Sequence, residues 1–278
     1  VRYVAHDGSG AGGQSWATAY KTIQAAISDS LMVAGGEIHV KKGTYRVTGA
    51  IKVTKAVRIY GGYSGVDETR NWTVYQTTVD GNDTSPHCFS VTTNATIDGF
   101  AIMQGYGLGS GANGGGVNIT SCAATITNCL FMYNHSGGFG GALATLAGTG
   151  SRIANCTFKQ NTASQCGGAI YNELGSNIQI TDCTFTSNAA DDSGGAIHNV
   201  QSKATITGCL FQGNKAAQTT LGVGGGILNE ESSATITNCV FTGNRAPYGV
   251  GVFNYLGSPT IDGCLFTNCS TSALSGGG

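Results

Sequence analysis

The feature that most constrains the fold is a motif repeated six times between Ile126 and Phe266. Each copy places an isoleucine, a turn residue, a cysteine and a phenylalanine at the same spacing, and the cysteines are Cys129, Cys156, Cys183, Cys209, Cys239 and Cys264. Their successive separations are 27, 27, 26, 30 and 25 residues. A repeat of this length with variable loops is typical of a solenoid, in which each coil packs on the next. We therefore expect function on the outer walls, in the loops or at the ends.

The register within the motif predicts a bend before each cysteine. In a straight strand, Cys129 and Phe131 would share one face and Ile126 would lie on the other. All three positions are apolar in every copy, so all three are expected to point inward, which requires a bend between them. The residues before the cysteines belong to the types that enter the left-handed region most readily. They are Asn128, Asn155, Asp182, Gly208, Asn238 and Gly263.

A second motif predicts a third strand in each coil. Five of the phenylalanines are followed three residues later by an asparagine, namely Asn134, Asn161, Asn188, Asn214 and Asn244. A glycine corner with an apolar residue comes next, as in Gly140–Leu143 and Gly167–Ile170. Paired glycines let one backbone approach another closely at a corner, and the apolar residue then returns to the core. The pattern predicts an all-β protein, a right-handed parallel β-helix of about ten coils with three strands per coil, spaced by about 4.8 Å.

The alternation of GGA[IL] and FxxN motifs over roughly residues 94–270 resembles a known signature. It is similar to the tandem repeats of the chlamydial polymorphic outer-membrane proteins and of related bacterial β-helix surface proteins. The resemblance implies a pectin-lyase-like fold and a surface or secreted protein that adheres to partners or self-assembles. The last copy departs from the signature, because Cys269 stands at the asparagine position.

The composition agrees with an extracellular protein. Lys and Arg total 14 against 15 Asp and Glu, and 10% of residues are charged, compared with about 25% in average proteins. This balance predicts neither nucleic acid nor anionic lipid as a partner, and no apolar run approaches the about 20 residues that a membrane span needs. A weakly charged surface permits association between subunits. Since residues 1–4 already have a strand pattern, we expect any signal peptide to have been removed or to be missing from the sequence.

We interpret residues 1–278 as one domain with three parts. Residues 1–93 form an N-terminal cap and the first coils, residues 94–270 the regular repeats, and residues 271–278 an unfinished coil. Apolar residues at helical spacing predict one amphipathic helix that covers the open end of the first coil. These are Trp16, Ala19, Tyr20, Ile23, Ala26 and Ile27.

Two columns of residues follow the corner isoleucines. The first column, Tyr171, His198, Leu228 and Phe253, should point outward and is our candidate for contact with a ligand or another subunit. The alternative is that a lateral loop covers it. The second column, Asn172, Asn199, Asn229 and Asn254, is expected to be a structural ladder whose amides bond from coil to coil.

The ten cysteines require two interpretations. The six ladder cysteines are expected to be small core hydrophobes. The alternative is disulfides between adjacent rungs, which parallel Cβ directions disfavour. Four further cysteines, Cys88, Cys122, Cys166 and Cys269, lie near predicted turns and could pair in an extracellular protein. No C-x-x-C spacing occurs, so the sequence predicts no zinc site, and we expect no metal or other cofactor.

The fold also hosts polysaccharide lyases and hydrolases, and a hydrolase would require paired carboxylates on neighbouring coils. Glu173 and Glu230 are the best pair, on coils two apart and with backbones about 10 Å apart, which is loosely compatible with an inverting hydrolase. Val200 lies between them and no base is fixed beside them. Asp98 and Asp262 match in position but lie six coils apart. Adjacent pairs such as Asp191 and Asp192 offer too few oxygens for calcium.

The sequence therefore leads to a prediction with an alternative. We expect an extracellular or cell-surface β-helix without catalytic residues, with a structural or adhesive role and self-assembly into filaments or a surface layer. Its partners would be copies of itself, a polysaccharide or a ligand on a host or cell surface. The alternative is a β-helix that binds or cleaves a polysaccharide through one wall.

Overall fold

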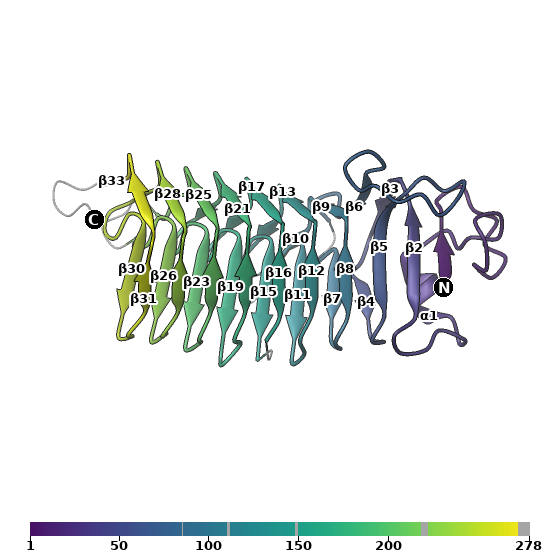
Figure 1. Ribbon diagram of the computed structural model, residues 1–278, viewed down its shortest axis with the longest axis horizontal. Helices are drawn as coiled ribbons and strands as arrows, with labels where there is room; N and C mark the ends of the chain where they lie inside the picture. The colour runs from purple at the N-terminus through teal and green to yellow at the C-terminus, as the bar shows by residue number, and fades with distance from the viewer. Residues whose placement is uncertain (85, 110–111, 148–149, 218–221, 272–278) are drawn as a thin grey trace.

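The strands wind into a right-handed parallel β-helix, seen from the side in the computed structural model of Figure 1. The structure describes residues 1–84, 86–109, 112–147, 150–217 and 222–271. Successive coils stack along the long axis, and the two termini lie at opposite ends (Figure 1). The segment 272–278, expected to begin an unfinished coil, lies outside the described residues.

Three long sheets form the walls. Sheet 1 contains, in spatial order, β1 (Arg2–Val4), β2 (Glu37–Lys41), β5 (Arg58–Tyr63), β8 (Thr96–Asp98), β12 (Thr125–Thr127), β16 (Arg152–Ala154), β20 (Gln179–Thr181), β24 (Thr205–Thr207), β27 (Thr235–Thr237) and β31 (Thr260–Asp262). Sheet 2 contains β3 (Gly43–Arg46), β6 (Thr77–Asp80), β9 (Phe100–Met103), β13 (Leu130–Met132), β17 (Thr157–Lys159), β21 (Thr184–Thr186), β25 (Leu210–Gln212), β28 (Val240–Thr242) and β32 (Leu265–Thr267). Sheet 3 contains β4 (Ile51–Val53), β7 (Phe89–Val91), β11 (Val117–Thr120), β15 (Leu143–Leu146), β19 (Ile170–Glu173), β23 (Ile197–Val200), β26 (Ile227–Glu230) and β30 (Val252–Tyr255).

Two short sheets add a further strand to many coils. One contains β10 (Tyr106–Gly107), β14 (His135–Ser136), β18 (Thr162–Ala163) and β22 (Ala189–Ala190), and the other β29 (Arg245–Ala246) and β33 (Ser270–Thr271). Four of these two-residue strands (β14, β18, β22 and β29) follow FxxN asparagines, whereas β10 follows Gly105 and β33 follows Cys269. None of the six was predicted. The prediction of a right-handed parallel β-helix is confirmed, with slightly fewer full turns than the about ten expected.

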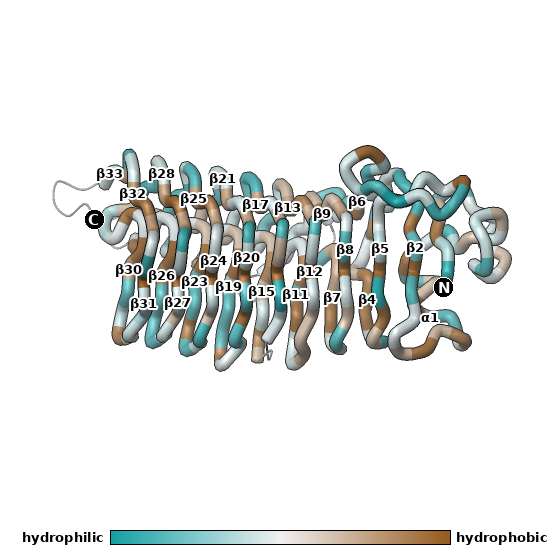
Figure 2. Tube along the Cα trace, in the orientation of Figure 1, coloured by the Kyte–Doolittle hydropathy of each residue, from teal (hydrophilic) through white to brown (hydrophobic). Residues whose placement is uncertain are grey.

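The predicted bend before each ladder cysteine is present in all six copies. The residues there have φ between 52° and 65°, in the left-handed region, as at Asn128 (55°) and Gly208 (65°). The bend turns Ile126, Cys129 and Phe131 inward together, and none is more than 3% exposed. Figure 2 shows hydrophobic and hydrophilic residues alternating along successive coils, as such a core requires.

The phenylalanines of the repeat form one continuous stack through the core. Consecutive rings from Phe131 to Phe266 have centroids 4.7 or 4.8 Å apart and nearly parallel planes. The FxxN asparagines form a parallel ladder at the next turn. The Nδ2 of Asn161, for example, donates to Asn188 Oδ1 at 3.0 Å and to the Phe131 carbonyl at 3.1 Å. Because these groups are buried, the bonds satisfy amide and carbonyl groups of the turn that water cannot reach.

All ten cysteines are free thiols, eight of them buried and Cys264 and Cys269 half-buried. Each ladder thiol lies against carbonyl oxygens, as Cys156 Sγ does 3.7 Å from the Ile126 oxygen and 3.2 Å from that of Ala154. Burial raises the pKa of Cys156 well above its ordinary value, which keeps this thiol neutral. Cys269 occupies the asparagine position of its coil and points Sγ at the Phe241 carbonyl (3.7 Å).

The N-terminal helix is shorter than predicted. Helix α1 (Ile23–Ser28) has six residues and contacts β1, β2 and β4, with Ile23, Ala26 and Ile27 buried. Thr22 caps it by accepting a hydrogen bond from the Ala25 amide at 3.1 Å. The helix cannot begin earlier because Tyr20 forms a parallel bridge with Val4 in extended backbone. Within the described ranges, no helix has the length and apolar character to cross a membrane.

Candidate functional site

The predicted contact column lies on sheet 3 but is largely covered. Tyr171, His198 and Leu228 pair in register along β19, β23 and β26 and are only 6%, 4% and 5% exposed. Phe253, next in register on β30, is half-buried. The expectation of an exposed stripe is therefore wrong for the first three residues. The turns before the glycine corners fold over this wall, as the stacking of the Phe139 ring on Tyr171 at 4.5 Å shows.

The glycine corners permit this cover because they pack directly on the column. Gly194 has a φ of 65°, and a Cβ placed on it would lie 2.6 Å from the Ile197 carbonyl oxygen and 3.0 Å from the His198 Cβ. Any side chain there would clash and would also adopt an unfavourable backbone conformation. The corner thus brings the turn residues before it, such as Ser193, over the outer face of His198.

The central feature of this wall is a hydrogen bond between His198 and the carboxylate of Glu230. His198 Nε2 lies 3.0 Å from Glu230 Oε2, with His198 side chain 5% exposed and that of Glu230 40% exposed. The hydrogen bond from His198 lowers the pKa of Glu230, so the carboxylate remains ionised at neutral pH. With the proton assigned to Nε2, the other ring nitrogen, Nδ1, is an acceptor. It is buried and has no hydrogen-bond partner in the described part of the chain.

The pair lies beside a cavity with a volume of about 270 Å³. The residues that line it combine titratable groups with aromatic and aliphatic side chains: Cys166, Asp192, Ser193, His198, Val223, Leu228, Glu230, Phe253 and Tyr255. A concave site with apolar walls and a few convergent polar groups is the usual form of a ligand pocket. We call this cavity the His198 pocket.

The Cys166 thiol and the Glu230 carboxylate of the His198 pocket differ in charge at neutral pH. Burial, together with the negative charges of Asp192 and Glu230, raises the pKa of Cys166 to about 12. Cys166 is thus a neutral thiol and a poor nucleophile at physiological pH. Ser193 donates to Asp192 Oδ1 at 3.1 Å and accepts from the Val223 amide at 3.2 Å, which fixes it in place. Glu230 is ionised and partly exposed, so it can accept a proton from a water molecule in the pocket.

The sequence-predicted pair of Glu173 and Glu230 does not form one site. Glu173 pairs in register with Val200, which pairs in turn with Glu230, so the two carboxylates lie two coils apart. The electrostatic partner of Glu173 is instead the neighbouring Tyr171. Burial, with a smaller effect of Glu173, raises the pKa of Tyr171. The sequence supplied His198 and Glu230 separately but not their contact, because the two residues lie on different coils and in different columns. The available signal was an outward histidine two positions before the acidic residue of the next coil, which places both side chains on the same face of the sheet.

The asparagine column lies where the ladder was expected. Asn172 Nδ2 donates to Asn199 Oδ1 (3.2 Å), Asn199 Nδ2 to Asn229 Oδ1 (2.9 Å), and Asn229 Nδ2 to Asn254 Oδ1 (2.8 Å). The first three are fully buried, and Asn254 in the last coil is exposed. The ladder holds the strands that carry the outward column in register, so it positions the His198 pocket.

A second cluster of charged and aromatic residues lies on sheet 1 near the N-terminus. His39 bonds to Glu37 (3.1 Å) and Glu68 (3.0 Å) and stacks on Tyr63 with ring centroids 4.3 Å apart. Arg70 from the same loop as Glu68 forms an ion pair with Asp98. These contacts anchor the loop after β5 to sheet 1. Asp98 Oδ2 also accepts hydrogen bonds from the side chains of Thr127 and Asn128. Asp262 lies far along the same sheet, as expected.

Within the ranges that the structure describes, no three His, Cys, Asp or Glu side chains are grouped so that they could hold a metal ion.

Comparison with known proteins identifies the fold at two levels. Residues 64–234 match the profile of a protein family described as a right-handed β-helix region. No curated protein matches the sequence.

Three solved structures share the fold over nearly all of the chain. The deglycosylated pectin methylesterase from Aspergillus niger is 15% identical, with a TM-score of 0.57, and the match covers 100% of this chain and 89% of that one. A second form of that enzyme, with an N-acetylglucosamine stub, is 17% identical over 99% and 86%, with a TM-score of 0.56. A pectin methylesterase in complex with a hexasaccharide is 9% identical over 91% and 80%, with a TM-score of 0.54. At these identities the likeness establishes the fold, which is pectin-lyase-like.

The comparisons correct one expectation. From the sequence we expected a protein that is not an enzyme, whereas all three of these solved structures are of enzymes. Composition and repeat regularity cannot separate the two classes, because the repeated residues build the coil and a site needs only a few side chains outside it.

Proposed function

We propose that this chain, which belongs to the family of right-handed β-helix regions, is a hydrolase that acts on a polysaccharide in the His198 pocket. The observation that carries the proposal is the contact between His198 and Glu230 beside a cavity with aromatic walls. Enzymes on this fold that act on a polysaccharide support it, since pectin methylesterases match the whole length of the chain.

The chemistry follows from the state of Glu230. Its side chain is partly exposed and ionised, and His198 fixes one of its oxygens. The free oxygen is suited to remove a proton from a water molecule as that water attacks a glycosidic or ester carbon. The departing oxygen of the substrate then takes a proton, either from the Glu230 carboxyl group, which has just received one from the water, or from solvent that reaches the partly exposed pocket.

The remaining lining suits a sugar ring. Phe253, Tyr255 and Leu228 offer apolar surface of the kind that stacks on the C–H face of a saccharide. The buried Nδ1 of His198 lacks a hydrogen-bond donor in the described structure, and a sugar hydroxyl would supply one. A ligand with both an apolar face and several hydroxyl groups meets these two requirements together.

The charge of the pocket favours a neutral or amino sugar. Asp192 and Glu230 line it, and none of the described lining residues is Lys or Arg. A carboxylate on the substrate would meet two like charges without a compensating cation, which is unfavourable. We therefore expect a neutral polysaccharide to be a better substrate than a polyuronate such as pectin, despite the shared fold.

The test is a substrate screen with a matched pair of variants. Neutral, amino and acidic polysaccharides are incubated with the protein, and new reducing ends and released ester groups are both measured. Glu230→Gln keeps the size of the side chain but removes the base, and we expect the rate to fall at least about 100-fold. Glu231→Gln is the control, because this adjacent carboxylate bonds to Gln201 instead and is not among the residues that line the pocket.

The outcomes separate binding from cleavage. A hydrolytic product that Glu230→Gln abolishes and Glu231→Gln preserves would support the proposal. Equal loss in both variants, or saccharide binding without any product, would refute the hydrolase. A clear preference for polyuronate would contradict the charge argument.

The setting of the protein is proposed on the sequence alone. We expect it to be extracellular or at a cell surface, from its low charge and its resemblance to the chlamydial polymorphic outer-membrane proteins. Self-association and contact with a host or cell-surface ligand remain predictions of the same resemblance. Electron microscopy of the native protein at neutral pH would reveal filaments or sheets if it self-assembles, and isolated rods if it does not.

A further inference from the structure

The six ladder cysteines repeat one sulfur position along the core. Each Sγ lies close to the same two carbonyl oxygens, that of the residue two positions earlier and that of the isoleucine in the preceding coil. Along the ladder the first distance is 3.1, 3.2, 3.2, 3.3, 3.2 and 3.4 Å. The second distance is 3.8, 3.7, 3.8, 3.8, 3.7 and 3.6 Å. All six side chains therefore have the same orientation, and their sulfurs repeat from coil to coil.

The spacing of this column follows from the phenylalanine stack in the same core. Phenylalanine rings one coil apart have centroids 4.7 or 4.8 Å from each other, so adjacent Sγ atoms are separated by about 4.7 Å. An S–S bond measures only about 2.05 Å, so adjacent thiols cannot form a disulfide unless the coils move. A metal–thiolate bond measures about 2.3 Å, and two such bonds in a straight line span about 4.6 Å. Adjacent ladder sulfurs thus have the separation that linear coordination of one metal ion requires.

One pair at the end of the ladder is within reach of solvent. Cys264 is half-buried, whereas the five earlier ladder cysteines are at most 3% exposed. The Cys239 amide nitrogen lies 3.4 Å from Cys264 Sγ, so the two residues are neighbours in the core. Both side chains point inward, across the long axis of the molecule, so each sulfur can direct a lone pair along the column. An ion from solvent can reach the Cys264 sulfur and find that of Cys239 behind it.

We propose that Cys239 and Cys264 bind one soft, divalent metal ion that prefers linear coordination, of which mercury(II) is the representative. Each thiol loses its proton to solvent as its sulfur–metal bond forms, so one ion displaces two protons and no electron is transferred. Soft thiolate ligands select metals of this class. The site is separate from the His198 pocket and goes beyond the hydrolase proposed there.

Charge and ligand number decide between metals. Cys239 belongs to the hydrophobic core and Cys264 packs against it, and burial of a net charge in such surroundings is costly. Two thiolates cancel the charge of a divalent ion, whereas a monovalent ion such as copper(I) would leave one negative charge. Zinc(II) takes four ligands in a tetrahedral arrangement, and no group of even three suitable side chains occurs in the part of the chain that the structure describes. The pair should therefore discriminate against zinc(II).

The test measures how much mercury(II) the whole protein retains against an excess of glutathione. We expect one ion per chain, and X-ray absorption should show two sulfur neighbours at about 2.3 Å from the metal. Zinc(II) should not be retained under the same conditions. Failure to retain mercury(II), a metal with a single sulfur neighbour, or zinc(II) retained as tightly as mercury(II) would each overturn the proposal.

Variants locate the ion. Cys264→Ala should weaken mercury(II) binding at least about 100-fold and abolish the two-sulfur coordination. Its side chain is half-buried, so circular dichroism should show that the fold is kept. Cys269→Ala is the matched control, because this thiol is equally half-buried but lies outside the ladder, and it should bind as the unaltered protein does. Two-sulfur coordination that survives Cys264→Ala would place the ion elsewhere and refute the assignment.

Cys239→Ala tests the second ligand with a reagent that needs only one. Methylmercury takes a single thiolate, so its reaction with Cys264 should be the same with and without Cys239. Mercury(II) affinity should fall at least about 100-fold in the same variant. If both reagents bind this variant as they bind the unaltered protein, Cys239 is not a ligand and the linear site is refuted.

Discussion

Replacing Asn188 by alanine tests whether the buried asparagine ladder stabilises the coil. The Asn188 side chain makes four hydrogen bonds with adjacent coils. Its Nδ2 donates to the Phe158 carbonyl and to Asn214 Oδ1, both at 2.9 Å. Its Oδ1 accepts from the backbone and side-chain amides of Asn161, both at 3.0 Å. The residue is fully buried, so water does not replace these bonds in the variant.

The expected cost follows from this count. A protein hydrogen bond contributes about 1 kcal/mol net, so the loss of four bonds predicts about 4 kcal/mol. The Asn161 backbone amide also loses its acceptor inside the protein, and an orphaned buried group is costly. For a chain of this size about 1 kcal/mol corresponds to about 2 °C, so the melting temperature should fall by about 8 °C.

Asn188→Asp separates hydrogen bonding from packing in the same assay. Aspartate has nearly the same shape but cannot donate, and it places a charge where none is solvated, so it should destabilise at least as much as alanine. Thr186→Ala, at a half-buried outward position of the same coil, should change stability by no more than about 0.5 kcal/mol. The measurement is thermal unfolding followed by circular dichroism at neutral pH. If Asn188→Asp melts within about 2 °C of the unaltered protein, the bonds are not what the ladder contributes.

Two further predictions concern titratable groups. Because the pKa of Glu230 is lowered in the folded state, its bond with His198 adds stability above the unfolded pKa near 4.5, and this stability is lost as pH falls through the folded pKa. The melting-temperature difference between the unaltered protein and His198→Gln should therefore shrink between pH 6 and about pH 3, and a difference independent of pH would contradict a bond to the ionised carboxylate. After unfolding without reductant, a thiol reagent should react with all 10 cysteines, whereas in the folded protein it should react with almost none of the eight buried ones. Fewer than 10 reactive thiols after unfolding would mean that disulfides form.

The solenoid was predictable because its determinants are local and repeated. A left-handed residue before each cysteine, as at Asn128, is a property of two or three adjacent residues, and its recurrence every 25 to 30 residues removes the ambiguity of any single copy. The N-terminal helix was predicted in kind but not in length. Tyr20 has helical spacing relative to Ile23, yet its backbone pairs with Val4, and a long-range bridge of this sort overrides a local pattern.

The candidate site was predictable only in part. Outward placement of Tyr171 and His198 follows from the alternation of strand residues, but their burial depends on where the loops before Gly167 and Gly194 come to lie. Those loops vary in sequence and have no period. The contact of His198 with Glu230 joins residues 32 positions apart on neighbouring coils, and side-chain length and rotamer decide which column each head group reaches.

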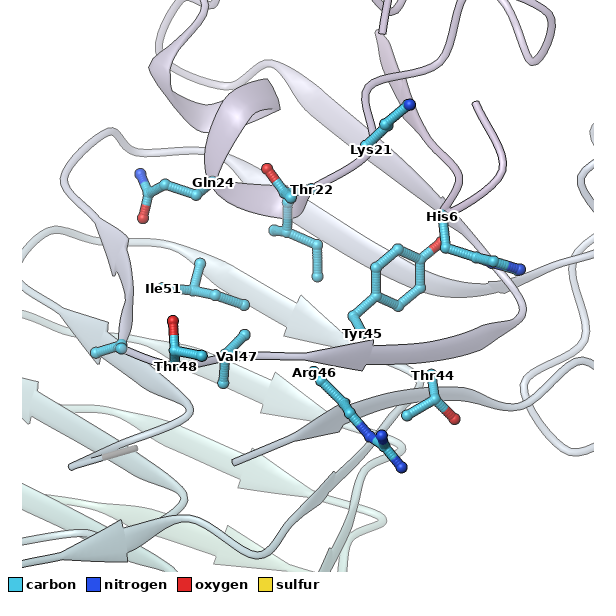
Figure 3. A pocket seen from close by; sticks show the side chains of 13 residues that line it. His6, Lys21, Thr22, Gln24, Thr44, Tyr45, Arg46, Val47, Thr48 and Ile51 are labelled. Atoms are coloured by element: carbon cyan, nitrogen blue, oxygen red, sulfur yellow. The ribbon is translucent and has the colours of Figure 1, made fainter. Parts of the chain in front are cut away.

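The sequence by itself determined the repeating coil, its inward face and the columns along its walls, because a period of strands and bends leaves only one way to bury the apolar residues. Only the tertiary structure decided which outward residues meet and which are covered. It joined His198 to Glu230, closed turns over Tyr171, and left a cavity beside Tyr45 between the cap and the first coil (Figure 3). The physical reason is that core positions are specified by hydrophobic pattern alone, whereas a site depends on the distances between a few side chains that no periodicity encodes.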